Sequence, residues 1–240
     1  MNLTFVVTGP TGCGKSKFAE DLAVKRKVEI VNADAFQMYK EIPIVSNQPE
    51  SSKVAHHFLA NRSLAEPISA GEFSRLSASA FSLNAIWVGT GLYLGAALYG
   101  LDADRKKGTP FQGEPLHPFK MIVVERDRAE LYEVLNQRVD QMIERGALDE
   151  IKKIQEMLTQ NQILATNHVL KAIGVRQMLS VFNQEMTHEK AIEIWKRDTR
   201  HLAKRQWTWL RKFCAPSKQI LWLNLSKEKE ALKQAEEFFA

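Results

Sequence analysis

The strongest constraint on the fold is the stretch GPTGCGKS, which spans residues 9–16. The apolar run LTFVV precedes it and predicts a buried strand, and KSKFAEDLAVKRK overlaps its end and carries apolar residues at helical spacing. A strand, a glycine-rich turn and a helix in direct succession bring backbone N–H groups together at the start of the helix, where they bind phosphate oxygens. The stretch therefore predicts a phosphate-binding loop of the pattern GxxxxGK[ST].

The side chains of this loop add chemistry to the backbone cradle. Lys15 supplies a cation, and the Ser16 hydroxyl is a ligand for Mg²⁺, whose other ligands are phosphate and water oxygens. The pattern specifies a diphosphate and leaves open which reaction uses it. The diphosphate-binding residues predicted from the loop are Gly9, Pro10, Thr11, Gly12, Cys13, Gly14, Lys15 and Ser16, with Ser16 as the metal ligand.

Predicted strands and helices alternate along the rest of the chain. Further strands are predicted at 28–34, 84–91, 119–125 and 219–225. Helices are predicted at 69–81, from 127 to before Gly146, at 147–161, at 187–213 and at the C-terminus. Ser69 with Glu72, and Asp127 with Glu130, have the spacing of helix N-caps. Residues 36–61 are predicted to form a polar loop.

This alternation is typical of an α/β fold, in which helices flank a mostly parallel sheet as in P-loop NTPases. We expect residues 1–240 to form a single domain. Residues 101–118 are rich in glycine, proline and charge, and we interpret them as a short linker.

Composition limits the class of protein further. The hydrophobic fraction of 45% suits a globular protein, and the net charge of +5 favours polyanionic partners. Cys13 lies inside the loop and Cys214 is far from it, so neither a disulfide framework nor a cysteine zinc site is expected. The sequence has neither a signal-peptide pattern nor a long apolar run. We therefore expect a cytoplasmic protein without a membrane segment, and nothing requires more than a monomer.

Two polar residues, Asp34 and Thr90, stand at the ends of predicted strands. Ligands of open parallel sheets bind at the carboxyl ends of the strands, so both residues are expected to face the phosphate-binding loop. There Asp34 could accept a proton, hold Mg²⁺ or cap a loop. The strand before Thr90 lacks the terminal aspartate that holds Mg²⁺ in hydrolysing P-loop enzymes, which argues against a plain NTPase.

The long helix at 187–213 has two different faces. Its apolar residues form one stripe, which consists of Ile192, Trp195, Leu202, Trp209 and Phe213. Its basic residues crowd the other faces and are Arg197, Arg200, His201, Lys204, Arg205 and Arg211. Only Asp198 offsets this charge, and we expect Trp207 to be exposed for stacking. The helix therefore predicts a contact with a phosphate backbone.

Taken in order, these pieces resemble the tRNA dimethylallyltransferase family. The resemblance covers most of the chain and rests on GPTGCGKS, NADAFQMYKEIPIVSNQP, SAGEF, VGTGLY, RAELYEVLNQRVDQMIERGALDEI, AIGVRQM and TRHLAKRQWTWLR. A P-loop alone is generic, whereas AIGVRQ followed by TRHLAKRQWTWLR is specific to this family.

The resemblance implies that the loop holds the diphosphate of dimethylallyl diphosphate rather than ATP. The N6 atom of an adenosine beside the anticodon would then attack C1 of the prenyl group while pyrophosphate departs, with Mg²⁺ as cofactor. Asp34 would accept the N6 proton, Thr90 would orient the reacting groups, and Lys171 would contact the diphosphate. The residues implied in adenosine and tRNA binding are Asp34, Ala35, Phe36, Gln37, Arg176, Arg200, Lys204 and Arg205, with Gln37 as the expected reader of the base edge.

The chain also departs from the family pattern. Ala35 replaces the usual serine, Lys171 replaces the usual arginine, and Gly95 replaces a usual basic residue. The family carries a helical insertion that grips the anticodon stem-loop, and residues 101–118 stand in its place here.

Three other functions remain open at this point. A prenyltransferase acting on free AMP, ADP or ATP would explain the missing insertion, whereas the basic helix argues against it. A P-loop kinase for a small metabolite would need an arginine cluster in a lid, which the sequence lacks. A degenerate RNA-binding module without catalysis would not be expected to retain Lys15, Ser16, Asp34 and Thr90 together.

Overall fold

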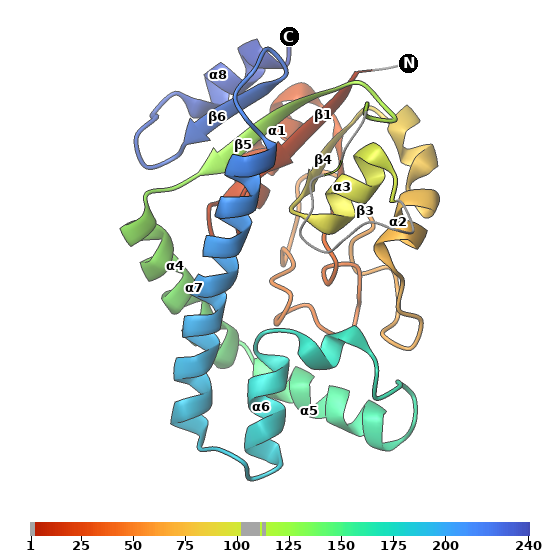
Figure 1. The fold of residues 1–240 in the computed structure, drawn as a ribbon, viewed down its shortest axis with the longest axis vertical. Helices are drawn as coiled ribbons and strands as arrows, with labels where there is room; N and C mark the ends of the chain where they lie inside the picture. The colour runs from red at the N-terminus through yellow and green to blue at the C-terminus, as the bar shows by residue number, and fades with distance from the viewer. Residues whose placement is uncertain (1–2, 102–110, 112–113) are drawn as a thin grey trace.

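The computed structural model describes residues 3–101, 111 and 114–240. Its described part contains a six-stranded sheet in the order β3–β2–β4–β1–β5–β6, and every neighbouring pair is parallel (Figure 1). The strands are β1 (Thr4–Thr8), β2 (Glu29–Ala33), β3 (His56–His57), β4 (Ala85–Gly89), β5 (Phe119–Glu125) and β6 (Ile220–Asn224). The predicted α/β fold with a parallel sheet is confirmed.

Eight α-helices and two 3₁₀ turns are assigned within the described residues. The helices are α1 (Lys15–Arg26), α2 (Ala70–Leu76), α3 (Leu92–Tyr99), α4 (Arg128–Glu144), α5 (Ala147–Thr159), α6 (Val175–Phe182), α7 (His188–Phe213) and α8 (Ala231–Phe238). The 3₁₀ turns are η1 (Ala78–Ser82) and η2 (His168–Lys171). None of the helices in this part of the chain is long and apolar enough to span a bilayer.

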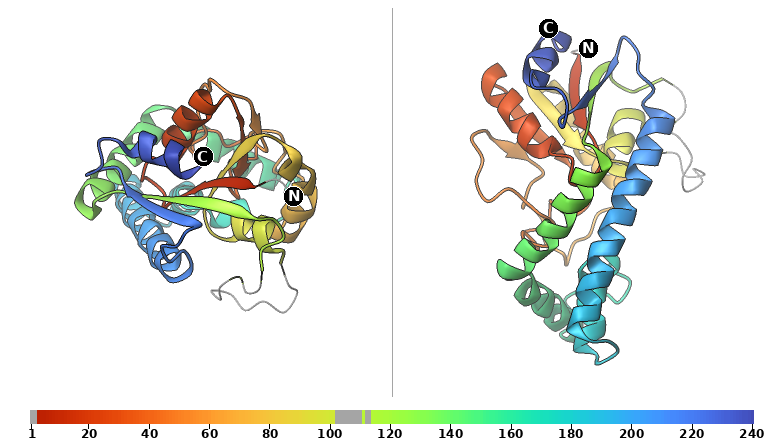
Figure 2. Two further views of the ribbon diagram at one scale, coloured as in Figure 1. Left: turned by 90° about the horizontal axis from the view of Figure 1, so that it is seen from above. Right: turned by 90° about the vertical axis from the view of Figure 1, so that its left-hand side faces the viewer.

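Apolar side chains cover both faces of the sheet. On one face, Val7, Ile86 and Ile122 pack against the buried side of α1 and against α8. On the other face, Trp87 and Met121 belong to a larger core shared with α2, α3 and the lower helices. Helices α4 and α7 run side by side away from the sheet, and α5 and α6 close the far end (Figures 1 and 2). A helical lobe therefore stands below the carboxyl edge of the sheet.

Local signals predicted most helix ends correctly. Ser69 caps α2, and its hydroxyl and the Glu72 carboxylate form the expected capping box. The helix predicted at 69–81 is shorter, because α2 ends at Leu76 and η1 follows it.

Two other local predictions were wrong. Asp127 occupies the N-cap of α4, but its side chain makes no cap; its Oδ1 accepts a hydrogen bond from Asn224 Nδ2 at 2.9 Å. The predicted polar loop at 36–61 contains β3, whose two residues pair with Ile30 and Val31 of β2. A strand this short has no periodicity of its own and forms because β2 offers a free edge.

The predicted linker at 101–118 lies mostly outside the described residues. Within it, Phe111 packs where a side chain on Gly95 would be, since a Cβ atom added there would lie 1.9 Å from Phe111 Cε2. The glycine that replaces the usual basic residue thus makes room for this aromatic ring.

Candidate active site

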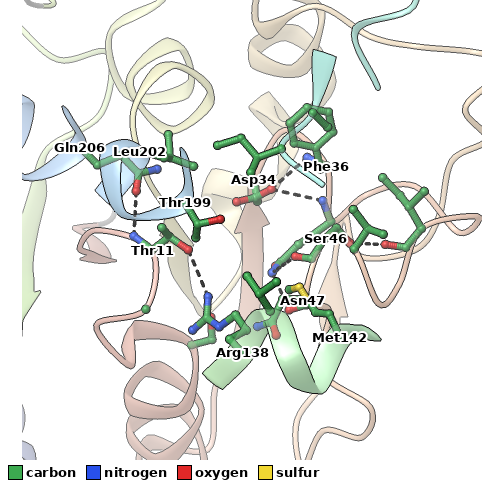
Figure 3. Close-up of a pocket in the computed structure, with 18 of the residues that line it drawn as sticks. Thr11, Asp34, Phe36, Ser46, Asn47, Arg138, Met142, Thr199, Leu202 and Gln206 are labelled. Atoms are coloured by element: carbon green, nitrogen blue, oxygen red, sulfur yellow. Dashed lines mark hydrogen bonds between the residues drawn. The ribbon is translucent and has the colours of Figure 1, made fainter. Parts of the chain in front are cut away.

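A cavity of about 590 Å³ lies between the carboxyl edge of the sheet and the helical lobe. Its walls come from the phosphate-binding loop, the segment after β2, the loop at 42–47, α4, η2 and α7 (Figure 3). This is where open parallel sheets bind their ligands.

The phosphate-binding loop forms one wall of the cavity. Gly12 and Gly14 have φ angles of 86° and 96°, in the left-handed region that favours glycine. A Cβ atom on Gly12 would lie 2.6 Å from Leu135 Cδ2, so the loop needs glycine there also for space. Five of its predicted diphosphate ligands line the cavity: Thr11, Gly12, Gly14, Lys15 and Ser16.

The other three predicted ligands of the loop, Gly9, Pro10 and Cys13, do not line the cavity. Cys13 is fully buried, and this burial raises the pKa of its thiol. The side chain therefore stays neutral and fills space behind the loop, while its backbone remains part of the loop.

Asp34 follows the last residue of β2 and faces the cavity (Figure 3). Its Oδ1 accepts hydrogen bonds from the backbone N–H groups of Phe36 at 2.9 Å and Gln37 at 3.3 Å. No described residue donates a hydrogen bond to Oδ2. One carboxylate oxygen therefore fixes the side chain, while the other is available to a ligand.

Gln37 also lines the cavity, but its amide group is partly committed. Its Nε2 donates to the carbonyl oxygens of Ser46, at 3.2 Å, and Asn47, at 2.9 Å. Both amide protons are therefore used within the chain, and only Oε1 could contact a base. The expected role of Gln37 as a reader of the base edge is narrowed to that of a hydrogen-bond acceptor.

The loop at 42–47 is held from its other side by Glu150 of α5. The two carboxylate oxygens accept hydrogen bonds from the N–H groups of Ile44, at 2.7 Å, and Val45, at 2.8 Å. Burial raises the pKa of this carboxyl group. Glu150 thereby positions a cavity wall without facing the cavity itself.

We expect Glu150→Ala to lower the free energy of unfolding by about 2 kcal/mol or more, because two backbone N–H groups lose their partner in a buried place. Urea unfolding followed by circular dichroism measures the change. Glu156→Ala on the exposed side of the same helix is the control and should change stability by less than about 0.5 kcal/mol. Equal effects of the two substitutions would contradict the assigned role of Glu150.

Thr90 lies behind the phosphate-binding loop rather than in the cavity wall. Its hydroxyl donates a hydrogen bond of 2.5 Å to the carbonyl oxygen of Gly9. The preceding residue, Gly89 at the end of β4, is packed equally closely, since a Cβ atom there would lie 2.4 Å from the Ala33 carbonyl oxygen. Any effect of Thr90 on the reacting groups therefore passes through the loop.

The predicted basic residues fall into two groups. Lys171, at the end of η2, and Arg205, on α7, line the cavity. Arg176, Arg200 and Lys204 do not. Arg176 pairs with Asp198, and Arg200 donates to Asn136 Oδ1. Of the predicted base-binding segment, Phe36 lines the cavity and Ala35 does not.

Arg138 of α4 lines the cavity, although it was not predicted from the sequence. Its Nη1 donates to Thr11 Oγ1 at 3.1 Å (Figure 3), and no carboxylate of the described residues balances its charge. Burial lowers the pKa of this guanidinium. A desolvated cation without an acidic partner is costly unless an anion binds to it. Arg138 and Lys15 line the same cavity.

Gln206 of α7 was missed as well. Its Oε1 accepts a hydrogen bond of 2.8 Å from the Thr11 backbone N–H (Figure 3). Thr11 is thus bonded to α4 through its hydroxyl and to α7 through its backbone. The side wall next to these contacts is apolar and includes Val139, Met142, Ile173, Trp195 and Leu202.

Comparisons with known proteins fit this geometry. The model of the IPP transferase family matches residues 103–213, and that of the isopentenyl transferase family matches residues 1–82. A tRNA dimethylallyltransferase of Acetivibrio thermocellus is 26% identical, and the alignment covers 93% of this chain and 92% of that protein. The corresponding protein of Salinibacter ruber is 27% identical over 86% of this chain and 84% of its own length. The chain belongs to the tRNA dimethylallyltransferase (IPP transferase) family.

Solved structures show the same fold. The tRNA isopentenylpyrophosphate transferase of Bacillus halodurans superposes with a TM-score of 0.84 at 21% identity, and the match covers 100% of this chain and 96% of that one.

The alignment with the Acetivibrio thermocellus relative runs over 296 positions, more than the 240 residues of this chain. That family member therefore contains residues without a counterpart here.

The stretch RAELYEVLNQRVDQMIERGALDEI contributed to the family resemblance, but Arg138 within it was not among the predicted site residues. Leu131, Leu135, Arg138 and Met142 recur at helical spacing, so Arg138 lies on the same side of α4 as buried leucines. A charged residue on the apolar side of a helix was the available signal for a buried ligand contact.

The prediction that Trp207 of α7 is exposed was wrong. It is half-buried and packs against the small cluster of Leu131, Leu135 and Ala203, with the Arg211 guanidinium 4.9 Å from its ring centroid. Since these groups cover the ring, Trp207 is not the exposed stacking platform that the sequence predicted.

Proposed function

We propose that this chain transfers the dimethylallyl group from dimethylallyl diphosphate to N6 of the adenosine next to the anticodon in tRNA, with release of pyrophosphate. One observation carries the proposal. A single cavity joins a phosphate-binding loop and two cations, Lys15 and Arg138, to the free carboxylate oxygen of Asp34 across an apolar wall.

The reaction needs three things from these residues. As N6 bonds to C1, the bond between C1 and the diphosphate oxygen breaks, and the leaving pyrophosphate takes the electron pair. Lys15, Arg138 and the loop N–H groups stabilise this negative charge. Asp34 Oδ2 accepts the proton that N6 loses. The apolar wall holds the prenyl chain and excludes water from the reacting carbon.

The same site suits a divalent cation carried by the substrate. Among the described residues, no cluster of three or more His, Cys, Asp or Glu side chains could hold a metal ion. The Ser16 hydroxyl lines the cavity beside the loop, and Mg²⁺ commonly takes its other ligands from substrate phosphates and water. When bound, Mg²⁺ would further neutralise the leaving group. Lys171 would reach the diphosphate from the opposite wall.

The proposal also includes an oligomeric state, a cellular location and a domain organisation. We propose that the protein acts as a monomer. A cytoplasmic location would give access to tRNA and the soluble prenyl donor. We assign residues 1–240 to one catalytic core and place the segment that longer relatives possess, and this chain lacks, at 101–118.

A donor experiment tests the proposal against a kinase. The protein is incubated with a tRNA anticodon stem-loop and either prenyl-labelled dimethylallyl diphosphate or ATP labelled on its γ-phosphate. We expect label on RNA only from the prenyl donor, with one pyrophosphate released for each prenyl group transferred. Label from ATP, or pyrophosphate release without prenylated RNA, would refute the proposal.

A further inference from the structure

Trp195 of α7 is the largest apolar side chain that lines the active-site cavity. Only 2% of its surface is exposed, so protein atoms surround most of the indole. It belongs to the same buried core as Met142, which also lines the cavity. The proposed reaction needs no chemical group of this side chain, so its contribution to the cavity is its shape.

The cavity residues of α7 form one row along the helix. They lie three or four residues apart along one side and are Trp195, Thr199, Leu202, Arg205 and Gln206. Gln206 marks the diphosphate end of this row, because its side chain accepts a hydrogen bond from the Thr11 N–H of the phosphate-binding loop. Trp195 precedes it by eleven residues, which places its Cα about 16 Å further along the helix axis. Trp195 therefore lies at the end of this row remote from the diphosphate.

The Trp195 ring has no room to move on the side where Gly174 packs against it. A Cβ atom on Gly174 would lie 2.4 Å from Cζ2 and 2.5 Å from Cε2 of the indole. Gly174 also has a φ angle of 94°, in the left-handed region that favours glycine. The ring therefore rests directly on the peptide backbone at the start of α6.

A buried polar network holds this backbone in place. The Gly174 N–H donates to Gln177 Oε1 at 2.8 Å, and Gln177 Nε2 donates to Asp198 Oδ2 at 3.0 Å. Gln177 and Asp198 are buried, and Arg197 Nε donates to the other oxygen of Asp198 at 3.1 Å. A buried network with its hydrogen bonds satisfied is rigid. The start of α6 is thereby tied to α7 three residues after Trp195.

The carbon chain of the donor is placed by the same geometry. Its C1 is bonded to the diphosphate in the loop, and the remaining carbons gain from burial against apolar side chains such as Leu202 and Ile173. A chain that follows the α7 row away from the loop meets the Trp195 indole at the end. A longer chain would have to displace a ring that Gly174 supports from behind.

We propose that Trp195 closes the far end of the prenyl site and thereby restricts the donor to a five-carbon chain. Trp195 is a specificity-determining residue, which contacts the end of the dimethylallyl group and takes no part in making or breaking bonds. This inference rests on the proposed function. It defines the class of donor that the site admits as five-carbon allylic diphosphates and excludes the ten-carbon homologue.

The first experiment needs no variant. Labelled dimethylallyl diphosphate and geranyl diphosphate, its ten-carbon homologue, are each offered with the anticodon stem-loop, and kcat/KM is measured for both. We expect the value for geranyl diphosphate to be lower by a factor of about 10² or more, because the additional carbons overfill the site. Values that agree within about tenfold would overturn the inference.

Substitution of the indole tests the residue itself. Trp195→Leu should raise the ratio of the geranyl to the dimethylallyl kcat/KM about tenfold or more, because further CH₂ groups can then be buried where the ring was. Trp195→Phe opens less space and should raise the ratio less. Trp222→Leu is the control, since this half-buried tryptophan of β6 does not line the cavity, and it should leave the ratio unchanged. A ratio measured on one preparation does not depend on the fraction of the protein that is folded.

Binding measured without RNA separates this inference from the proposed function, because no transfer occurs without an acceptor. Isothermal titration calorimetry gives Kd for both diphosphates. Tighter binding of geranyl relative to dimethylallyl diphosphate in Trp195→Leu, with no transfer to RNA by any variant, would refute the proposed function and support the size limit. Dimethylallyl transfer with the same donor ratio in the parent protein, Trp195→Leu and Trp222→Leu would refute this inference alone. A Trp195→Leu variant altered only in KM for the stem-loop would also refute it and place the indole against the acceptor.

Discussion

Asp34→Asn is expected to lower kcat for prenyl transfer by a factor of about 10² to 10⁴ while the protein stays folded. The asparagine Oδ1 keeps the acceptor that holds the Phe36 and Gln37 N–H groups, but the basic Oδ2 is lost. The positioned proton acceptor is removed, and general-base catalysis contributes a factor of this size. Single-turnover transfer to a stem-loop measures the change in the chemical step.

Two controls accompany this variant. Binding of dimethylallyl diphosphate, followed as a shift in the thermal unfolding temperature, should be retained because the diphosphate ligands are unchanged. Asp149→Asn at an exposed position of α5 removes the same charge and should leave turnover unchanged. Near-normal turnover of Asp34→Asn would show that another group takes the proton from N6.

Arg138→Met should have the other large effect: it should lower the activity and raise the thermal stability of the ligand-free protein. Loss of a cation aimed at the leaving group should reduce kcat/KM for dimethylallyl diphosphate by a factor of about 10² to 10³. The same substitution removes a desolvated charge that has no described carboxylate partner. Without ligand, Tm should therefore rise by about 2–4 °C, corresponding to about 1 kcal/mol.

Differential scanning calorimetry with and without pyrophosphate tests both parts of this prediction. In the parent protein, pyrophosphate at 100 times its Kd stabilises by about 2.7 kcal/mol, and most of this shift should disappear at the same concentration in Arg138→Met. Arg128→Met, an exposed position on the same helix, is the control. A lowered Tm together with an unchanged pyrophosphate shift would make Arg138 a structural residue.

The fold was largely predictable because its signals are local. The strands that became β1, β2, β4, β5 and β6 are short apolar runs bounded by turns, and Ser69 with Glu72 specifies the start of α2. β3 carries no such signal, since only its pairing with β2 makes it a strand. The Asp127 cap failed because a distant residue, Asn224, binds the carboxylate instead.

The site residues that could be predicted also have local signals. Lys15 and Ser16 belong to the glycine-rich pattern after one predicted strand, and Asp34 ends another; the structure places all three at one cavity. Arg138 and Gln206 form hydrogen bonds with Thr11 only because α4 and α7 pack against the loop, so no short sequence pattern predicts these contacts. Their contacts depend on the tertiary structure.

The basic residues of α7 illustrate the limit of reading charge from sequence. Arg197 and Lys204 look equivalent in the sequence, yet Arg197 has a carboxylate partner and Lys204 has none among the described residues. Pairing depends on the carboxylates that lie nearby, which are Asp198 on α7 itself, Asp140 of α4 and Glu125 of β5. A count of cations therefore overstates the surface available to RNA.

The central claim is that one cavity brings a prenyl diphosphate to N6 of an adenosine in tRNA. Labelled dimethylallyl diphosphate is offered with an anticodon stem-loop and free AMP in the same reaction, and the products are separated by size and digested to nucleosides. The account predicts label on the stem-loop, recovered as N6-prenylated adenosine. Label on AMP alone would contradict it and make the cavity the site of an adenylate prenyltransferase.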